Sequence, residues 1–220
     1  MNSTQNGGRR RTAPDARRAG SARLWLVLGV AVAIAAVLGW MRFAAPPVPQ
    51  GNLAGAALGG PFTLTDQDGR TVRDRDFAGR WRLVYFGYAF CPDICPTDLA
   101  FVGRGLKAFE AQDARLGAKV APIFITIDPA RDTPAAIKPF VAAFHPRLVG
   151  LTGTPAQIDA VAKAFGVYAK KVDTGDPENY LMDHSAMVYL FDPDGKPVAF
   201  LPHQGLTAEA VTNLLATHVR

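Results

Sequence analysis

Cysteine is the scarcest residue of this chain, which has 2 cysteines among 220 residues. Two cysteines cannot form the disulfide network that stabilises many small secreted domains, so the fold must depend on a hydrophobic core. With 49% hydrophobic, 20% charged and 10% aromatic residues, the composition also excludes an intrinsically disordered chain. We therefore expect one folded domain of ordinary size with one appended segment, in which Cys91 and Cys95 act as a pair.

Positive charge is not in excess over most of the chain, although the whole sequence has a net charge of +5. Seven of the 24 Lys and Arg residues lie within residues 1–45, where Asp15 is the only acidic residue. Residues 46–220 contain 17 basic and 18 acidic residues, which leaves a net charge of −1. A near-neutral domain lacks the basic surface that nucleic acids require, so we expect no nucleic-acid partner.

Charge is absent from residues 24–41, LWLVLGVAVAIAAVLGWM. A helix of this length would span roughly 27 Å, enough to cross a bilayer. Trp25 and Trp40 lie near its ends, and most of the N-terminal arginines precede it, which favours a cytoplasmic N-terminus. We predict a basic cytoplasmic tail over residues 1–23 and a single transmembrane helix over residues 24–41. The following residues would then lie on the periplasmic side of a bacterial-type inner membrane, or on the equivalent outer face of an organelle inner membrane.

A cleaved signal peptide is the alternative for this segment. The apolar run exceeds the usual length of a signal-peptide core, and Phe43-Ala44-Ala45 is a poor cleavage site. No cysteine follows the run as a lipoprotein anchor would require. Residues 42–60 are rich in Pro, Gly and Ala and are expected to form a linker, which leaves residues 61–220 as the folded domain.

Strand and helix patterns alternate along the predicted domain. Two dense apolar runs indicate strands that are buried on both faces, and the segment between them has helical spacing. The order is βαβ first and ββα last, which predicts an α/β fold of thioredoxin type, a mixed sheet flanked by helices. The expected elements are a hairpin (61–77), buried strands (81–88 and 119–128), a helix from Thr133, a strand (148–153), a helix (154–165), a hairpin (186–201) and a C-terminal helix from Thr207.

The two cysteines directly follow the first buried strand and precede a helix. Open α/β sheets place their functional sites at this carboxyl end of the strands. Once the segment is helical, the four-residue spacing puts both thiols on one face, where the helix N-terminus favours a thiolate. Cys91 and Cys95 could bind one soft metal ion or form a disulfide. A structural disulfide in so short a loop would restrain the unfolded chain little.

Two thiolates do not complete a metal coordination sphere, and His184 is the candidate third ligand. It directly precedes the predicted strand 186–192, and in a thioredoxin-like fold the loop before this strand faces the cysteines. Redox thioredoxins carry a cis-proline in this loop, whereas this chain has a histidine. Two sulfurs and one imidazole suit copper, although zinc also fits these donors. The other histidines are expected at the surface: His145, His203 and His218.

Four segments together resemble the Sco/SenC family of membrane-anchored copper proteins, in order over nearly all of residues 58–218. The resemblance implies a thioredoxin-like fold in which Cys91, Cys95 and His184 bind one copper ion per chain, as Cu(I) or Cu(II). It also implies copper delivery to the copper A centre in subunit II of cytochrome c oxidase, with a copper donor or reductant that the sequence does not identify. The segments are FGYAFCPDICPTDL (86–99), ITIDPARDTP (125–134), FHPRLVGLTGT (144–154) and YLMDHSAMVYLFDPDG (180–195).

Four further polar residues are expected to support this site. Asp128, Arg131 and Asp132 match the DPxRD stretch of the family. Because Asp128 ends the second buried strand, we expect it to orient the site, whereas Arg131 and Asp132 shape the start of the next helix. Asp183 is expected to hold the imidazole in one tautomer.

Three other functions use the same residues. Reduction of the copper A cysteines by a thiol-disulfide oxidoreductase is the main alternative, although a CxxxC spacing differs from the usual CxxC. A peroxidase of peroxiredoxin type would use Cys91 to attack peroxide without copper. A redox or copper sensor is the third. The first two are enzymes, whereas a copper chaperone is not.

Overall fold

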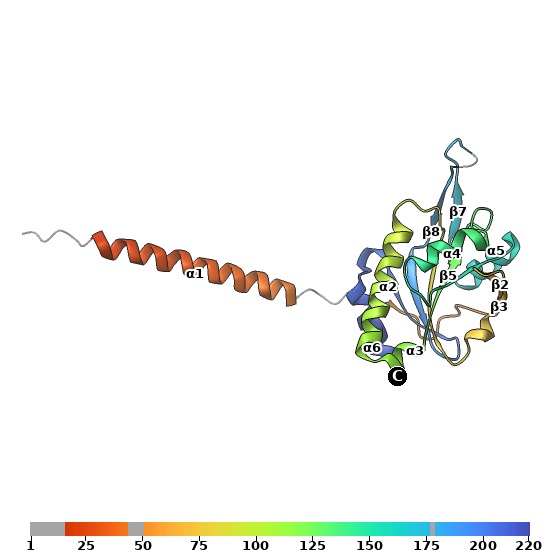
Figure 1. Ribbon diagram of the computed structural model, residues 1–220, viewed down its shortest axis with the longest axis horizontal. Coiled ribbons are helices and arrows are strands. Elements are labelled where there is room, and N and C mark those ends of the chain that lie inside the picture. The colour runs from red at the N-terminus through yellow and green to blue at the C-terminus, as the bar shows by residue number, and fades with distance from the viewer. Residues whose placement is uncertain (1–15, 44–50, 177–178) are drawn as a thin grey trace, which may run out of the picture. The chain divides into compact units, whose positions relative to one another are not determined.

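The structure, a computed structural model, describes residues 16–43, 51–176 and 179–220. Residues 1–15 of the predicted tail and residues 44–50 of the predicted linker lie outside this part. The chain divides into two units, residues 1–47 with a single helix and residues 48–220 with the folded domain (Figure 1). Each unit is described by itself.

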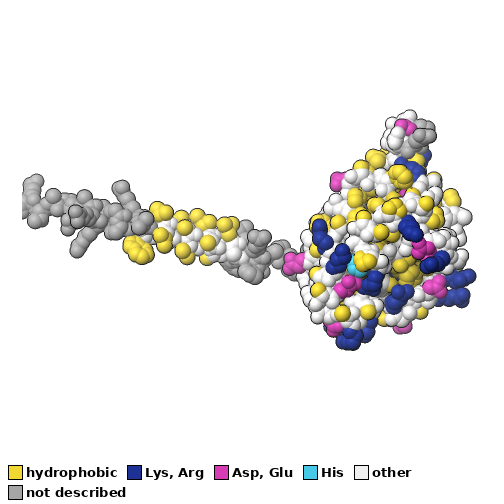
Figure 2. Space-filling model, in the orientation of Figure 1, with side chains coloured by type: hydrophobic (Ala, Val, Ile, Leu, Met, Phe, Trp, Pro, Cys, Tyr) yellow, Lys and Arg dark blue, Asp and Glu magenta, His cyan; other side chains and the backbone are white. Residues whose placement is uncertain are grey.

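Helix α1 (Ala16–Phe43) contains the whole uncharged stretch, residues 24–41. Where its side chains are described, over residues 25–39, they are apolar and mostly exposed, with Trp25 72% exposed (Figure 2). Among the residues that the structure describes, no helix combines the length and the apolarity needed to cross a membrane. The predicted span 24–41 extends beyond the described side chains at both ends, and it stays a prediction.

Eight strands of the domain form one mixed sheet in the order β1-β10-β9-β4-β5-β6-β2-β3. The central strands β4, β5 and β6 are parallel, and the neighbours on both sides are antiparallel. The predicted strands and hairpins are confirmed, and so is the order βαβ followed by ββα. The bounds are β1 (Gly51–Asn52), β2 (Thr63–Asp66), β3 (Thr71–Arg73), β4 (Trp81–Gly87), β5 (Val120–Thr126), β6 (Val149–Thr152), β9 (Met187–Phe191) and β10 (Pro197–Pro202).

Helices cover both faces of this sheet. Neighbouring residues of a strand point to opposite faces. In β4, Tyr85 contacts Asp98 of α2, and Phe86 packs against Phe165, which directly follows α5. Helices α2 and α5 therefore lie on opposite faces. The bounds are α2 (Ile94–Gln112), α3 (Ala114–Ala118), α4 (Pro134–Ala142), α5 (Pro155–Ala164), α6 (Ala208–His218) and the short 3-10 helices η1 (Asp74–Phe77) and η2 (His203–Gly205).

Helices α2 and α6 lie side by side (Figure 1). A Cβ atom at Gly105 of α2 would lie 2.5 Å from the carbonyl oxygen of Ala208, so only glycine permits this close approach. The hydroxyl of Thr212 in α6 donates a hydrogen bond to the Gly105 carbonyl over 3.0 Å. The helix that begins at the cysteines is thereby held firmly to the domain.

Residues 51–60 belong to the domain and not to a linker, which corrects the predicted boundary at residue 60. Gly51 and Asn52 form strand β1, which pairs with β10 at the sheet edge. The amide of Leu53 donates to the carbonyl of Val198, and the amide of Gly59 donates to that of Ala164. The Gly- and Ala-rich composition of this segment suggested a flexible chain, but its backbone groups are hydrogen-bonded to the sheet and to α5.

Strands β7 (Ala169–Val172) and β8 (Leu181–His184) form a separate two-stranded sheet that projects from the domain (Figure 1). They pair antiparallel, with Ala169 opposite His184. The two strands form a hairpin. It carries His184 at its inner end.

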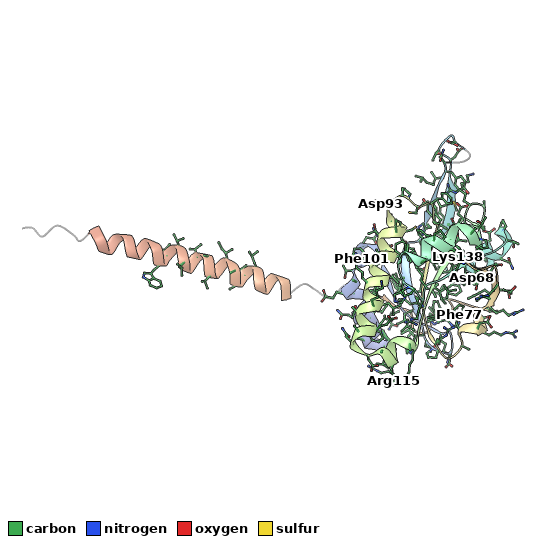
Figure 3. The ribbon with its side chains drawn as sticks, viewed as in Figure 1. Asp68, Phe77, Asp93, Phe101, Arg115 and Lys138 are labelled. Carbon is green, nitrogen blue, oxygen red and sulfur yellow. The ribbon has the colours of Figure 1, made fainter. Side chains whose placement is uncertain are left out.

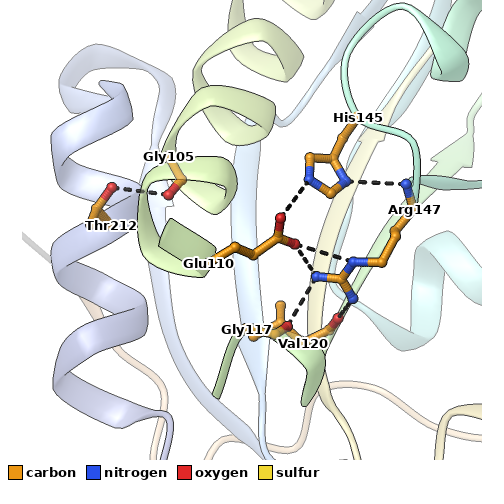
Figure 4. A network of polar contacts seen from close by, with 7 residues as sticks. All are labelled: Gly105, Glu110, Gly117, Val120, His145, Arg147 and Thr212. Carbon is orange, nitrogen blue, oxygen red and sulfur yellow. Dashed lines mark hydrogen bonds and ion pairs between the residues drawn. The ribbon is translucent and has the colours of Figure 1, made fainter. Parts of the chain in front are cut away.

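His145 is buried, with 2% exposure, so the prediction that it lies at the surface was wrong. It belongs to a polar network near the C-terminal end of α2. Its Nδ1 accepts from the Arg147 amide over 3.2 Å, so its Nε2 carries the proton and contacts the Glu110 carboxylate at 3.4 Å (Figure 4). The Arg147 guanidinium pairs with Glu110 and donates to the carbonyls of Val120 and Gly117 over 2.7 and 3.0 Å. Both ring nitrogens of His145 are therefore used within the protein.

Candidate metal and thiol site

The candidate site lies where β4 ends and α2 begins. The amide of Cys91 donates to the Tyr88 carbonyl in the turn between them, and α2 starts at Ile94. Asp93 precedes α2 at the end of the domain from which the β7–β8 hairpin projects, and Arg115 marks the opposite end (Figure 3). As predicted, the cysteines follow the carboxyl end of a central parallel strand.

The two thiols differ in exposure and in acidity. Cys95 is fully buried and Cys91 is half-buried, and both are free cysteines. The hydrogen bond that Cys91 accepts from the Cys95 thiol lowers the pKa of Cys91 to about 5, and the Cys95 amide at 3.4 Å adds to the effect. The same thiol hydrogen bond, together with burial, raises the pKa of Cys95. At neutral pH the pair therefore holds one thiolate and one thiol.

His184 reaches the cysteines from the hairpin. Its Nε2 lies 3.5 Å from the sulfur of Cys95, and its Nδ1 lies 3.2 Å from the carbonyl oxygen of Ser185. Because a carbonyl only accepts, Nδ1 carries the proton and Nε2 directs its lone pair toward the sulfur. The rings of Tyr85 and Tyr88 stand edge-on to the imidazole, with centroids 6.5 and 6.1 Å away. The imidazole is thus fixed in position and in tautomer.

The site opens into a cavity of about 340 Å³ with a mostly apolar lining. Cys91 and His184 line it, together with Met182, whose side chain lies on the same side of β8 as His184. Phe90, beside Cys91, is 54% exposed at the surface. A large molecule or an incoming ligand can therefore approach the Cys91 thiol from solvent.

The donor set fits a soft metal ion. Within the described part of the chain, no three His, Cys, Asp or Glu side chains form a finished group that could hold a metal. Cys91 and His184 line one pocket, Cys95 lies buried behind them in contact with both residues, and the three would have to close around an ion. One thiolate, one thiol and one unprotonated imidazole nitrogen match the preferences of copper, and three donors leave a coordination position open.

The two predicted supporting carboxylates do not contact the imidazole in the expected way. The carbonyl of Ser185, and not Asp183, faces Nδ1 of His184, although Asp183 is exposed and lines the same pocket. Asp128 is buried, but it accepts from the Tyr180 hydroxyl and from Arg131, each over 2.6 Å. Sequence reasoning missed Tyr180, although it opens the YLMDH segment that carries His184.

A second buried carboxylate near the site was also missed. Asp98 in α2 is fully buried, accepts from the Tyr85 hydroxyl over 3.0 Å and lies 2.8 Å from Nδ1 of His203. The Tyr85 hydroxyl also hydrogen-bonds with Cys95. His203 and His218 are partly exposed, which agrees with the prediction that they lie at the surface.

The fold and the site together define a thioredoxin-like domain in which two cysteines and one histidine lie together beside a pocket. The sequence model of the family described as SCO1/SenC matches residues 50–220. Protein SenC of Rhodobacter capsulatus is 44% identical over 176 residues, which are 80% of this chain and 77% of that protein. The chain belongs to the SCO1/SenC family. It spans about half the length of mitochondrial relatives that it also matches.

Solved structures of the family share this fold. The copper-bound structure of Bradyrhizobium japonicum ScoI is 44% identical, with a TM-score of 0.66 over 74% of this chain and 100% of that chain. A structure of BsSco, described as having a disulfide switch and as a member of the Sco family of cytochrome c oxidase assembly proteins, is 26% identical. Its TM-score is 0.58 over 77% of this chain and 95% of that chain.

Proposed function

We propose that this chain is a copper chaperone that binds one copper ion through Cys91, Cys95 and His184. The observation that carries the proposal is the contact between Cys95 and His184, 89 residues apart, beside a pocket that Cys91 lines. The copper-bound relative from Bradyrhizobium japonicum supports it. Thiolates favour Cu(I), and the imidazole helps to accommodate Cu(II).

Uptake of the copper cargo follows from the state of each donor. The lowered pKa of Cys91 makes its thiolate available at neutral pH. Cys95 must lose its proton to bind, so each copper ion bound releases about one proton at this site. Release needs a competing ligand, for which the open cavity at Cys91 provides access. A partner could therefore take the copper by ligand exchange.

The proposed acceptor is the copper A centre in subunit II of cytochrome c oxidase. The description of BsSco as a member of a cytochrome c oxidase assembly family supports this choice. In cells that lack this chain, we expect oxidase with little copper A absorption. Wild-type protein should restore the absorption, and His184→Ala should not. Restoration by His184→Ala at equal protein level would contradict a role in copper delivery.

We further propose that α1 anchors the domain to the inner membrane, with the domain on the periplasmic or equivalent outer face. The uncharged residues 24–41 and the preceding arginines support this topology. The substitutions Val30→Arg and Ile34→Arg together should move the chain from the membrane fraction to the soluble fraction. The same pair of changes at exposed positions of the domain, Val172→Arg and Leu181→Arg, serves as the control.

Metal analysis of the full chain in detergent tests the binding site directly. We expect about one copper per wild-type chain, with sulfur-to-copper charge transfer in the Cu(II) form. Cys91→Ala, Cys95→Ala and His184→Ala should each lower the copper content after dialysis. His218→Ala, a half-buried histidine near the end of α6, is the matched control. Unchanged Cu(II) spectra in His184→Ala would remove it from the ligand set.

Thiol-disulfide reduction of the copper A cysteines is the second candidate, and the acidity difference between the thiols favours it. The Cys91 thiolate would attack the target disulfide and release one target thiolate, and Cys95 would then lose its proton and attack Cys91. The products are a reduced target and a Cys91–Cys95 disulfide. Cys95→Ser should trap the mixed disulfide at Cys91. His184→Ala should keep this activity while losing copper, which separates the two functions.

A further inference from the structure

Arg131 lies between the two chain segments that carry the proposed ligands. Its guanidinium carbon is 5.1 Å from the ring centre of Phe90, the residue before Cys91. It is 3.6 Å from the ring centre of Tyr180, four residues before His184. A guanidinium stacks favourably on aromatic faces, and more strongly when it is shielded from water. Arg131 thus connects the cysteine segment to the histidine hairpin.

Asp128 fixes both Arg131 and Tyr180. One carboxylate oxygen accepts from Nε of Arg131, and the other accepts from the Tyr180 hydroxyl, each over 2.6 Å. All three side chains are shielded, with Tyr180 7% exposed and Asp128 3% exposed. We call Asp128, Arg131 and Tyr180 the clamp. A charged pair with a shared hydroxyl donor is stronger and more directional than an exposed ion pair.

The hairpin needs such side-chain contacts to hold its position. Strands β7 and β8 pair with each other in a sheet that is separate from the eight-stranded sheet. Their ladder hydrogen bonds therefore do not fix the hairpin relative to β4 and the cysteines. The clamp holds Tyr180, which directly precedes β8, and Tyr88 contacts His184, the last residue of β8.

We propose that Arg131 is a positioning residue that holds the imidazole of His184 within reach of the two thiols. This inference rests on the proposed copper function, and it gives Arg131 a role beyond shaping the start of α4. Outer groups that orient a metal ligand typically change metal affinity by about 10- to 100-fold. We expect an effect of this size when Arg131 is removed.

The first test needs no copper. Amide hydrogen exchange of the full metal-free chain is measured by mass spectrometry for wild type, Arg131→Ala and Arg131→Lys. Arg131→Ala should speed exchange in residues 169–184 by about tenfold and leave β5 unchanged. Arg131→Lys keeps the charge but loses the planar stacking, so it should give an intermediate rate. Arg80→Ala, which removes a guanidinium 5.2 Å above the Phe77 ring, is the matched control.

The second test measures Cu(I) affinity by competition with a chromophoric chelator. Arg131→Ala should weaken binding by about 10- to 100-fold in the wild-type background. In the His184→Ala background the same change should have less than about a threefold effect, because the ligand that the clamp positions is gone. A merely structural role would weaken binding equally in both backgrounds.

Failure of the clamp and failure of the copper function are distinguishable. Unchanged exchange in residues 169–184 of Arg131→Ala would overturn the clamp, and so would equal losses of affinity in both backgrounds. If wild type binds no copper, the proposed function fails, and the exchange data alone decide whether Arg131 holds the hairpin. Should Arg131→Ala not fold, Arg131→Lys and Tyr180→Phe decide in its place.

Discussion

His145 and His184 both contact polar partners through Nδ1, but they differ in the group that faces Nε2. His145 has both ring nitrogens engaged, with the Arg147 amide on Nδ1 and Glu110 on Nε2. His184 has Nδ1 on a backbone carbonyl, but its Nε2 faces the sulfur of Cys95. A buried histidine whose nitrogens are both used stabilises the fold, whereas one whose lone pair faces soft donors is available to bind.

The surroundings of the two histidines follow the same division. The network around His145 joins α2 to α3, to the first residue of β5 and to the loop before β6, and it includes two hydrogen bonds to main-chain carbonyls. The surroundings of His184 are aromatic rings and a separate hairpin. The polar groups at one end of the domain therefore satisfy one another, whereas the other end leaves an imidazole nitrogen facing a sulfur beside a pocket.

Replacing each of the two histidines with alanine in turn should give the largest difference in copper affinity. His184→Ala should weaken copper binding by more than about 100-fold, because it removes a direct ligand and not only a group that orients one. His145→Ala should leave copper affinity within about twofold, because its nitrogens face protein groups. Competition titrations with a Cu(I) chelator give both values. A comparable loss of affinity in His145→Ala would break the distinction between the two ends.

The pH dependence of Cys91 alkylation should test the acidity of the site directly. With a pKa of about 5, its thiolate fraction rises as the pH increases through 5. At pH 6 Cys91 should be about nine-tenths ionised, whereas an ordinary thiol of pKa about 8.5 is below about 1%. Alkylation by iodoacetamide, followed by mass spectrometry of the metal-free chain, should label Cys91 and spare buried Cys95.

Cys95→Ala provides the control for this acidity. It removes the thiol hydrogen bond that contributes most to lowering the pKa of Cys91. The midpoint of the alkylation profile should therefore move to higher pH. A midpoint that stays near 5 in Cys95→Ala would assign the acidity to the start of α2 and not to the partner thiol.

The comparison also explains what the sequence could and could not predict. The cysteine pair and the flanking strand were recognisable because local apolar runs determine where β4 ends. His184 was found through its position before a buried strand. The burial of His145 was missed because it depends on Glu110, 35 residues earlier. Asp128 was expected at the site, but its partners are determined by packing with Tyr180, 52 residues later.

Glu110→Gln should test whether the opposite end is built for stability. The change keeps the size of the side chain but removes its negative charge. That charge pairs with Arg147 in the network that surrounds His145. We expect a loss of about 2 kcal/mol in the free energy of unfolding, measured in urea, with copper affinity unchanged. Glu209→Gln, at an exposed position of α6, should cost little.

Asp132→Asn and Asp113→Asn should change the free energy of unfolding in opposite directions, and these effects should be the smallest. Burial raises the pKa of Asp132, which accepts from the Ala89 amide and the Thr126 hydroxyl, from 3.8 to about 6. Its stabilising contribution is therefore complete below pH 3.8 and declines as the pH rises through 6. Relative to wild type, Asp132→Asn should gain roughly 1–2 kcal/mol of unfolding free energy between pH 4 and 7. The Leu116 amide lowers the pKa of Asp113 below its ordinary value of 3.8, so the stabilising contribution of Asp113 is complete above pH 3.8 and is lost as the pH falls below that value. Asp113→Asn should therefore be less stable than wild type by a constant amount between pH 4 and 7. A gain of stability in both variants would contradict the opposite pKa shifts of the two carboxylates.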